Sequence, residues 1–517
     1  MGEALGYDTE EEQKVLNADR WAPEVVYDAQ QQLYYMFLSA TPEAADVATG
    51  KGVFTGEARE LMVVAVSDRP HTGFRLVNFK DASSCGAENL HSYNEMQGMS
   101  NGNGGYMEAY PQYYAKYAVL DPAQHRAVTK ANGGFGGTYQ GGFEQAIDPH
   151  PYVAPNGDKY LFWTNSKGTD RIFGVKMINW LKPDWSTATL ISYRGYYTVA
   201  DWKAAQKGEK VPMVTYEPSD SSKINEGAEV IYHDGKYYMT YSANSYGDNT
   251  YLVAQAVSDH VLGPYRKLTE AEGGILLSGQ LQGNPDVTGT GHHSLVQAGD
   301  QLFMLYHRHE DPTAGGAKRY PALDEVKWIT VKDQNGQDLQ VMYVNGPTNT
   351  PQPKVELHSY YKNLADEAAV SGSADAAYLT DGLLSHLKNP DPIFATYIPE
   401  TTIDQTTTFT FDFSKPKTVK SVMVYNARLE SSCITSLDKI EIVCMKDGRE
   451  VTYTRSNVKL RSDYYTTDAS GRVSYLTPCA AICEDMSFTN VICVKITISV
   501  PQNQQVAAIS EVKILGK

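Results

Sequence analysis

The sequence predicts an all-β protein in which a β-propeller, built from repeated four-stranded units, is followed by a β-sandwich. Two kinds of repeat within residues 24–306 predict the propeller: a hairpin, and a second module that follows two copies of that hairpin. A set of short alternating strands within residues 406–515 predicts the sandwich.

The hairpin is clearest at residues 226–242, where Glu226-Gly-Ala-Glu229 runs into an apolar strand, the turn Asp234-Gly235 and an aromatic-rich strand. An Asp-Gly pair between strands of this kind is a strong signal for a tight hairpin turn. Similar units, each an apolar strand, a polar turn and an aromatic-rich strand, recur at residues 24–39, 150–163 and 293–306.

A second module strengthens the repeat, because residues 64–75 resemble residues 255–266 in their Ala-Val-Ser-Asp core. The hairpin units start at 24, 150, 229 and 293, which indicates one type of blade with insertions between the copies. Repeated four-stranded units of this kind are typical of a β-propeller. We expect the active centre at the end of the axis where the first strands of the blades converge.

Length and composition limit the function classes. A chain of 517 residues is expected to hold two domains. With 45 basic and 61 acidic residues the net charge is −16, which argues against nucleic acid or an anionic membrane as a partner. No apolar run approaches a membrane-spanning length, and the acidic N-terminus has no secretory signal as written. The six cysteines fit buried thiols and one or two disulfides equally well.

Three polar residues recur near the starts of the hairpin units. Asp148 is expected to stand just before the first strand of its blade, as Glu226 does in the next blade, and His292 takes the analogous place in the last. The structural alternatives are an exposed carboxylate for Glu226 and a hydrogen-bonded strand end for His292. Residues 78–146, which contain no clear hairpin, are expected to form an insertion over the propeller face.

Several motifs, in this order along the chain, resemble glycoside hydrolase family 43, whose members are five-bladed β-propeller enzymes acting on arabinose- and xylose-containing glycans. The resemblance covers roughly residues 1–350. It is carried by Trp21-Ala22-Pro23-Glu24, Ile147-Asp148-Pro149, Glu226-Gly227-Ala228, Gly289-Thr290-Gly291-His292 and the closing Asn345-Gly346-Pro347-Thr348.

The resemblance implies an inverting hydrolase of O-glycosidic bonds, of the α-L-arabinofuranosidase or β-xylosidase type. Glu226 would be the general acid, and Asp148 would orient it and raise its pKa. Such enzymes place a second carboxylate about 6.5–9.5 Å from the acid, where it activates water. His292 matches an axial histidine that lies beside a water-ligated cation, often calcium. Residues that would bind substrate are Trp21, Glu24, His292 and Arg319.

The chain departs from the family at the general base, an Asp in an Asp-Pro motif upstream of the Trp-Ala-Pro motif. Only 20 residues precede Trp21, and neither Asp8 nor Asp19 has that context. The base is therefore not identified, and we expect that the first blade is truncated and that this chain is weakly active or inactive. The alternative function is a non-catalytic propeller that binds glycan.

Residues from about 354 onward show a different pattern, of short alternating strands without the hairpin repeat. Phe409, Phe411 and Phe413 alternate on one face of a half-buried strand, and similar strands are expected at 419–425, 439–443, 494–500 and 509–515. Short strands separated by turns suggest a β-sandwich. The two prolines of Pro351-Gln-Pro-Lys354 mark a linker, which gives domains at residues 1–353 and 354–517.

Three motifs in this second domain resemble the discoidin-like, galactose-binding-like domain of the coagulation factor 5/8 C-terminal type: Asn363-Leu-Ala365, Tyr378-Leu-Thr-Asp-Gly382 and Ile509-Ser-Glu-Val512. The resemblance implies a structural calcium near Asp381 and Glu511, and no organic cofactor. The domain would bind sugar or brace the propeller, and an adhesive or structural module led by it is a third function class. The expected partner is a polysaccharide or oligosaccharide, and the expected protein is a monomer that is secreted, periplasmic or at the cell surface.

Overall fold

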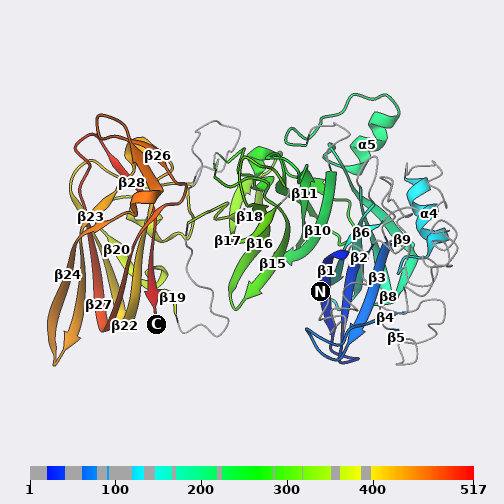
Figure 1. The fold of residues 1–517 in the computed structure, drawn as a ribbon, viewed down its shortest axis with the longest axis horizontal. Helices are drawn as coiled ribbons and strands as arrows, with labels where there is room; N and C mark the ends of the chain where they lie inside the picture. The colour runs from blue at the N-terminus through cyan, green and yellow to red at the C-terminus, as the bar shows by residue number, and fades with distance from the viewer. Residues whose placement is uncertain are drawn as a thin grey trace, which may run out of the picture. The chain divides into compact units, whose positions relative to one another are not determined.

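The fold was taken from a computed structural model (Figure 1), which describes residues 20–40, 61–77, 90–91, 119–132, 146–165, 171–217, 224–282, 284, 286–316, 318–350, 361–385 and 398–517. The chain divides into two compact units. The first comprises Met1–Asn244 with Ala254–Leu268, and the second comprises Ser245–Val253 with Thr269–Lys517.

The described part of the first unit contains three antiparallel sheets, and in each of them the strands follow chain order. The strands are β1 (Arg20–Asp28), β2 (Leu33–Ala40), β3 (Leu61–Ser67), β4 (Arg75–Val77) and β5 (Leu90–His91); β6 (Ile147–Val153), β7 (Lys159–Asn165), β8 (Arg171–Asn179) and β9 (Lys182–Tyr193); and β10 (Ile224–His233), β11 (Lys236–Asn244), β12 (Leu252–Ser258) and β13 (Arg266–Lys267). Apart from the first two residues of β12, all of these strands belong to the first unit.

A fourth sheet of the same type lies in the second unit, with order β15-β16-β17-β18. Four blades are thus seen among the described residues, in the propeller-like manner that the hairpin repeat predicts. The strands of this sheet are β15 (Gly291–Ala298), β16 (Gln301–His309), β17 (Arg319–Lys332) and β18 (Asp338–Val344), and the short β14 (Ile275–Leu277) precedes them.

The Asp-Gly turn between β10 and β11 forms as predicted. Asp234 and Gly235 have φ values of 46° and 82°, as a type I′ turn requires at both central positions. Glycine adopts such angles at no steric cost, and Asp tolerates them better than most residues. The turn therefore fixes the register in which β10 faces β11 from Ile224 to His233.

The same irregularity interrupts the first strand of every described blade. Between two paired positions the first strand contains one residue more than the second strand, which defines a β-bulge. The bulges lie between Trp21 and Glu24, Ile147 and His150, Glu226 and Glu229, and Gly291 and Ser294.

Within the first unit, strand β6 contacts both β1 and β10, so the first strands of three blades stand next to one another as the inner strands of a propeller do. Apolar residues of the outer strands fill the space between the first two blades, and Phe37 packs edge-on against Trp180. Trp163 stacks on Phe173 in the same core. This packing holds the first strands side by side.

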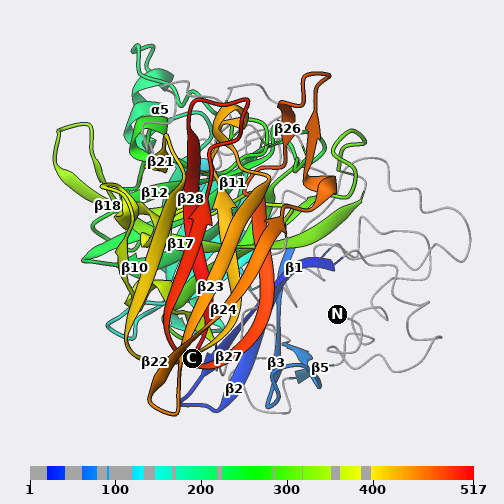
Figure 2. The ribbon, with the colours of Figure 1, turned by 90° about the vertical axis from the view of Figure 1, so that its left-hand side faces the viewer.

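The C-terminal strands of the second unit form one eight-stranded sheet, with the order β19-β28-β22-β27-β23-β24, in which β20 also pairs with β22 and β21 with β28. Figure 2 shows the long strands of this sheet. Its strands are β19 (Lys362–Asn363), β20 (Ala369–Ser371), β21 (Thr401–Ile403), β22 (Thr407–Asn426), β23 (Ser436–Lys446), β24 (Arg449–Lys459), β27 (Ala481–Ile498) and β28 (Ala507–Gly516); β25 (Tyr465–Thr467) and β26 (Val473–Leu476) pair separately.

The alternation predicted for this region is confirmed. Phe409, Phe411 and Phe413 of β22 are all buried and lie in one apolar core. The long strand β22 pairs with β27 along most of its length and with β28 over its second half, so the region is one connected sheet. A two-layer sandwich stays a prediction. The five cysteines of this region, four of them buried, are free thiols.

Two helices interrupt the strands in the described part of the first unit: α4 (Pro122–Ala131) and α5 (Val199–Gln206). A capping box begins α5, because the Thr198 hydroxyl accepts a hydrogen bond from the Asp201 amide and the Asp201 carboxylate accepts one from the Thr198 amide. Among the described residues, neither helix nor any other is long and apolar enough to cross a membrane.

Some predicted features lie outside the described residues. These are the truncated edge of the first blade, with Asp8 and Asp19, the linker at 351–354, and most of the insertion predicted at 78–146. Of that insertion, α4 is the longest part that the structure describes.

Candidate active site

The bulges place the predicted site residues within the first strands. Asp148 and Glu226 lie inside β6 and β10, so the prediction that they stand just before these strands is wrong. They also differ by one position. Asp148 takes the second place of its bulge, which Gly227 holds in β10, whereas Glu226 takes the first place. The spacing already contains this offset, because Asp148 lies two residues before His150 whereas Glu226 lies three residues before Glu229.

The second place of each bulge has positive φ. Ala22, Asp148, Gly227 and His292 have φ values of 47°, 52°, 59° and 46°. His292 therefore does occupy the place in its blade that Asp148 occupies in the second. Positive φ is uncommon for residues other than glycine, and it recurs where a protein aims a functional side chain.

Asp148 is a buried aspartate, with 5 % of its surface exposed. Its backbone amide donates a hydrogen bond of 2.9 Å to the hydroxyl of Ser39 on β2. Glu226, by contrast, is half-buried on the neighbouring first strand. The pair thus offers one desolvated carboxyl group and one that solvent reaches, an arrangement in which environment separates the roles of two carboxyl groups.

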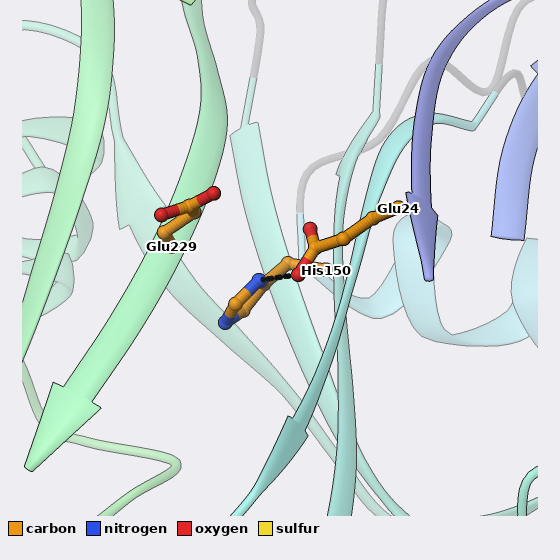
Figure 3. Close-up of side chains that lie close together, drawn as sticks. All are labelled: Glu24, His150 and Glu229. Atoms are coloured by element: carbon orange, nitrogen blue, oxygen red, sulfur yellow. Dashed lines mark hydrogen bonds and ion pairs between the residues drawn. The ribbon is translucent and has the colours of Figure 1, made fainter. Parts of the chain in front are cut away.

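A cluster of Glu24, His150 and Glu229 lies directly beyond these bulges. The three residues hold the same place after the bulge in β1, β6 and β10. Figure 3 shows the imidazole of His150 between the two carboxylates, and one ligand atom from each residue lies within 4.8 Å of the others. The carboxylate of Glu24, a residue predicted to bind substrate, accepts a hydrogen bond from His150 Nδ1 at 2.7 Å.

Both ring nitrogens of His150 are engaged. The backbone N–H of Val230 on β10 donates to Nε2 at 3.0 Å, so Nε2 carries no proton in this arrangement. The ring proton therefore lies on Nδ1, where it is donated to Glu24. Burial works against the charged ring, but the Glu24 carboxylate, through its charge and hydrogen bond, and the Glu229 charge together raise the pKa of His150 above its ordinary value.

The hydrogen bonds also decide whether this cluster fits a metal ion. A histidine ligand needs a free lone pair on one ring nitrogen. In His150 the Nε2 lone pair accepts from Val230, and Nδ1 carries the proton given to Glu24. This geometry is that of a hydrogen-bonded link between strands and does not fit a metal centre.

His292 and Arg319 belong to the second unit. The Arg319 guanidinium lies 3.4 Å from His307 Nε2 and 5.4 Å from the centre of the Tyr246 ring. Burial, with the nearby Arg319, His292 and His309, lowers the pKa of His307 to about 3. This set of imidazoles and a guanidinium differs from the oxygen ligands that calcium prefers.

Asp381 and Glu511 lie close to one another in the second unit. The amide of Gly382 donates to Glu511 Oε2 at 3.3 Å, while Glu511 Oε1 is buried with no hydrogen-bond partner among the described residues. Burial raises the pKa of Asp381 to about 6 and that of Glu511 well above its usual value, and the charge of Asp381 adds to the shift of Glu511. Two neighbouring desolvated carboxyl groups with an unsatisfied oxygen fit a calcium ion.

Sequence reasoning singled out Asp148 and Glu226 but not His150 or Glu229. A signal for these residues was available, because the hairpin units were counted from Glu24, His150 and Glu229, the three positions that the bulge registers make equivalent. Trp21, also predicted to bind substrate, lies half-buried at the first place of the β1 bulge, opposite Ser39.

The chain is similar to several known glycosidases. Over 85 residues it is 33 % identical to the Beta-D-galactofuranosidase xynD of Aspergillus niger; the alignment covers 16 % of this chain, and the chain spans only 23 % of that relative's length. A solved thermostable family-43 glycoside hydrolase is similar at 22 % identity, with 65 % of this chain and 78 % of that one covered and a TM-score of 0.41. The Cellvibrio cellulosa alpha-L-arabinanase complexed with arabinohexaose is similar at 16 % identity, with coverage of 65 % and 83 % and a TM-score of 0.35.

A family model gives the comparison that bears on the site itself. The matched residues, 130–330, run from the end of α4 into β17 and include Asp148, Glu226, His292 and Arg319. The first blade, with Trp21 and Glu24, and the C-terminal sheet lie outside them. The segment that carries the candidate acid and its neighbouring aspartate matches Glycosyl hydrolases family 43, and this match supports a glycoside hydrolase.

Proposed function

We propose that this protein is an inverting glycoside hydrolase that acts on arabinose- or xylose-containing polysaccharides, as an α-L-arabinofuranosidase or β-xylosidase does. The observation that carries the proposal is the family-model match over residues 130–330, because it spans the two blades on which Asp148 and Glu226 stand.

In this proposal Glu226 is the general acid. Cleavage of a glycosidic bond needs a proton on the leaving oxygen, and a half-buried carboxylic acid can both meet the substrate and hold that proton. Asp148, buried at the bulge of the adjacent first strand, is proposed to orient Glu226 and to raise its pKa through its negative charge. The general base is assigned to none of the described residues.

A structural calcium at Asp381 and Glu511 is part of the proposal. The two carboxylates would bind the ion with Glu511 Oε1 as a ligand, which would satisfy a buried oxygen that otherwise has no partner among the described residues. The ion would brace the C-terminal sheet and would take no part in the reaction. His292, whose surroundings in the second unit are cationic, is the weaker candidate for holding a cation.

The test is hydrolysis of a panel of aryl glycosides: α-L-arabinofuranoside, β-D-xyloside and, because one curated relative is a galactofuranosidase, β-D-galactofuranoside. Turnover of one panel member, with a product of inverted anomeric configuration by NMR, is expected. Glu226→Gln should lower that turnover about 10²–10⁴-fold, and substrates with acidic leaving groups should lose least.

Glu209→Gln, at an exposed glutamate on the same unit, is the matched control and should leave turnover unchanged. Retained sugar binding with no turnover on any substrate would favour the glycan-binding alternative instead. Equal losses on all substrates in Glu226→Gln would show that Glu226 binds rather than protonates.

A further inference from the structure

We infer that His150 is a positioning residue that holds the first strands of three blades in the alignment that the candidate acid needs. The inference rests on the proposed function for its kinetic consequences, but its structural basis, two hydrogen bonds of one buried imidazole, is independent of it.

The two hydrogen bonds of His150 connect segments far apart in the sequence. Glu24 on β1 lies 126 residues before His150, and Val230 on β10 lies 80 residues after it. Side chains at the same place after three bulges thus meet around one ring. No backbone hydrogen bond of the ladders joins β6 to β1 or to β10, because each belongs to a different sheet. The imidazole therefore adds directional contacts between the first strands themselves, beside the hydrogen bond that the Asp148 amide makes to Ser39 on β2.

The link lies close to the candidate catalytic groups. Asp148 is two residues before His150, a distance of about 7 Å along a strand, and Glu226 is four residues before Val230. Asp148 takes the second place of its bulge and Glu226 the first place of the next one, and the link lies just beyond each bulge. A bulge lacks one regular pair of ladder hydrogen bonds, so its residues depend on neighbouring contacts for their position. The His150 link anchors the adjoining end of each bulge.

The link works with the neutral ring only. A proton on Nε2 would face the N–H of Val230 and break that hydrogen bond, while the Nδ1–H bond to Glu24 would survive. The titratable groups that face the ring are Glu24 from β1 and Glu229 from β10, and Tyr152 stacks beside it on β6 at 6.0 Å. Burial of the ring and two hydrogen bonds of 2.7 and 3.0 Å make this an ordered contact rather than a solvent-exposed one.

Two substitutions separate the two hydrogen bonds. His150→Asn puts an amide N–H near the place of Nδ1, where it can donate to Glu24, but it cannot reach Val230. His150→Gln puts a carbonyl oxygen near the place of Nε2, where it can accept from Val230. Ser294→Ala is the matched control, because Ser294 holds the same place after the bulge of β15 and is exposed.

The expected result is a fall in kcat with KM nearly unchanged. A misplacement of about 1 Å can cost about 10²-fold in rate, so His150→Ala should lower kcat by about that factor, and the Asn and Gln variants should fall between it and the wild type. Because His150 acts through Glu226, adding His150→Ala to the Glu226→Gln variant should lower kcat little below that of Glu226→Gln alone. A residue that only stabilises the fold would lower kcat equally in both backgrounds, and that outcome would overturn the inference.

An NMR measurement tests the two hydrogen bonds of His150 without an activity assay. In protein labelled with ¹⁵N in its histidines, the His150 ring, identified by its loss in His150→Asn, should show a protonated Nδ1 and a bare Nε2 at alkaline pH, above the raised pKa of the ring, and addition of Zn²⁺ should leave it unchanged. A proton on Nε2, or a zinc-dependent shift abolished by His150→Asn, would mean that the ring is not the link described. If the wild type hydrolyses no substrate while the Nδ1–H form is found, the proposed function fails and the link stands.

Discussion

The backbone amide of Asp148 donates a 2.9 Å hydrogen bond to the hydroxyl of Ser39, 109 residues earlier in the chain. Ser39 is fully buried on β2 and pairs there with Trp21, the first residue of the bulge in β1. The contact therefore joins the bulge of the second blade to the bulge of the first. It holds Asp148 in its uncommon backbone conformation, with φ of 52°, and so fixes the direction of the carboxylate.

If Asp148 raises the pKa of the acid, Asp148→Asn should move the basic limb of the pH profile. The amide keeps the size of the side chain but removes its charge, so the protonated form of Glu226 loses its electrostatic support and titrates at lower pH. We expect the basic limb of kcat/KM on an aryl α-L-arabinofuranoside to shift toward acid, together with a lower maximum.

Ser39→Ala serves as the comparison for Asp148→Asn. It removes the hydroxyl that receives the Asp148 amide but leaves the carboxylate charge in place. Its basic limb should stay where the wild type has it, even if the maximum falls. A shift of the same size in both variants would mean that position, and not charge, is what Asp148 contributes.

The buried ion pair of Lys267 and Glu217 should be costly to break on one side. Lys267 Nζ lies 2.5 Å from Glu217 Oε2, and the Tyr241 hydroxyl and the Gly195 amide also donate to this carboxylate. Because both partners are almost completely buried, Lys267→Met leaves an uncompensated charge. We expect a loss of about 3–5 kcal/mol in the free energy of unfolding, measured by urea denaturation.

Replacing both partners tests the cause of that loss. Lys267→Met with Glu217→Leu should recover much of the stability, because no isolated charge is then left in the interior. The exposed pair Lys332–Asp338, at 2.6 Å, is the control: Lys332→Met should change the stability by no more than about 1 kcal/mol. Equal costs at the two pairs would contradict the burial argument.

Gly291, the first residue of the bulge in β15, should not tolerate a side chain. A Cβ atom there would lie 2.0 Å from a carbon of the Tyr251 ring, and that ring is buried and stacked on His307. Gly291→Ala should therefore destabilise the protein by about 1–3 kcal/mol or more. Gly247→Ala, where a Cβ would meet only the Ser245 hydroxyl at 3.5 Å, should leave the stability nearly unchanged. Thermal denaturation of the two variants measures the difference.

The blades could be predicted from the sequence because their signals are local. The Asp234-Gly235 turn determines a hairpin wherever it occurs, and the alternation of Phe409, Phe411 and Phe413 reports a buried face without knowledge of the partner strand. Helix α5 was not predicted, although its Thr198–Asp201 capping box is also a local signal.

The site could be predicted only in part, because the missing information is not local. The repeat indicated that Asp148 and Glu226 stand near the same level of two first strands, but only the strand pairing shows that both residues lie in bulges. The contact of His150 with Glu24 joins residues 126 apart, and no spacing rule reports which side chains of different sheets will meet.

The last prediction concerns calcium and pH at Asp381 and Glu511. Without the ion, the carboxyl group of Asp381 titrates at about 6 in the folded protein, against about 4 in an unfolded chain. Between these values the unfolded chain has released its proton while the folded one keeps it. Stability in the presence of EGTA should therefore fall as the pH rises from about 4 to about 6. Calcium reverses the sign, because its ligands must be deprotonated, so with excess calcium this contribution should rise over the same range.

Thermal unfolding of the intact protein in EGTA and in calcium, at intervals across this range, measures both slopes. The groups near Asp381 that also respond are Lys327 and Glu511, and Lys513 and Asp366 act on Glu511 in turn. Asp381→Asn should remove most of the difference between the two conditions, while Asp404→Asn, at an exposed aspartate of the same unit, should keep it. Parallel curves in EGTA and calcium for the wild type would show that these carboxyl groups bind no calcium, and that burial alone raises their pKa values.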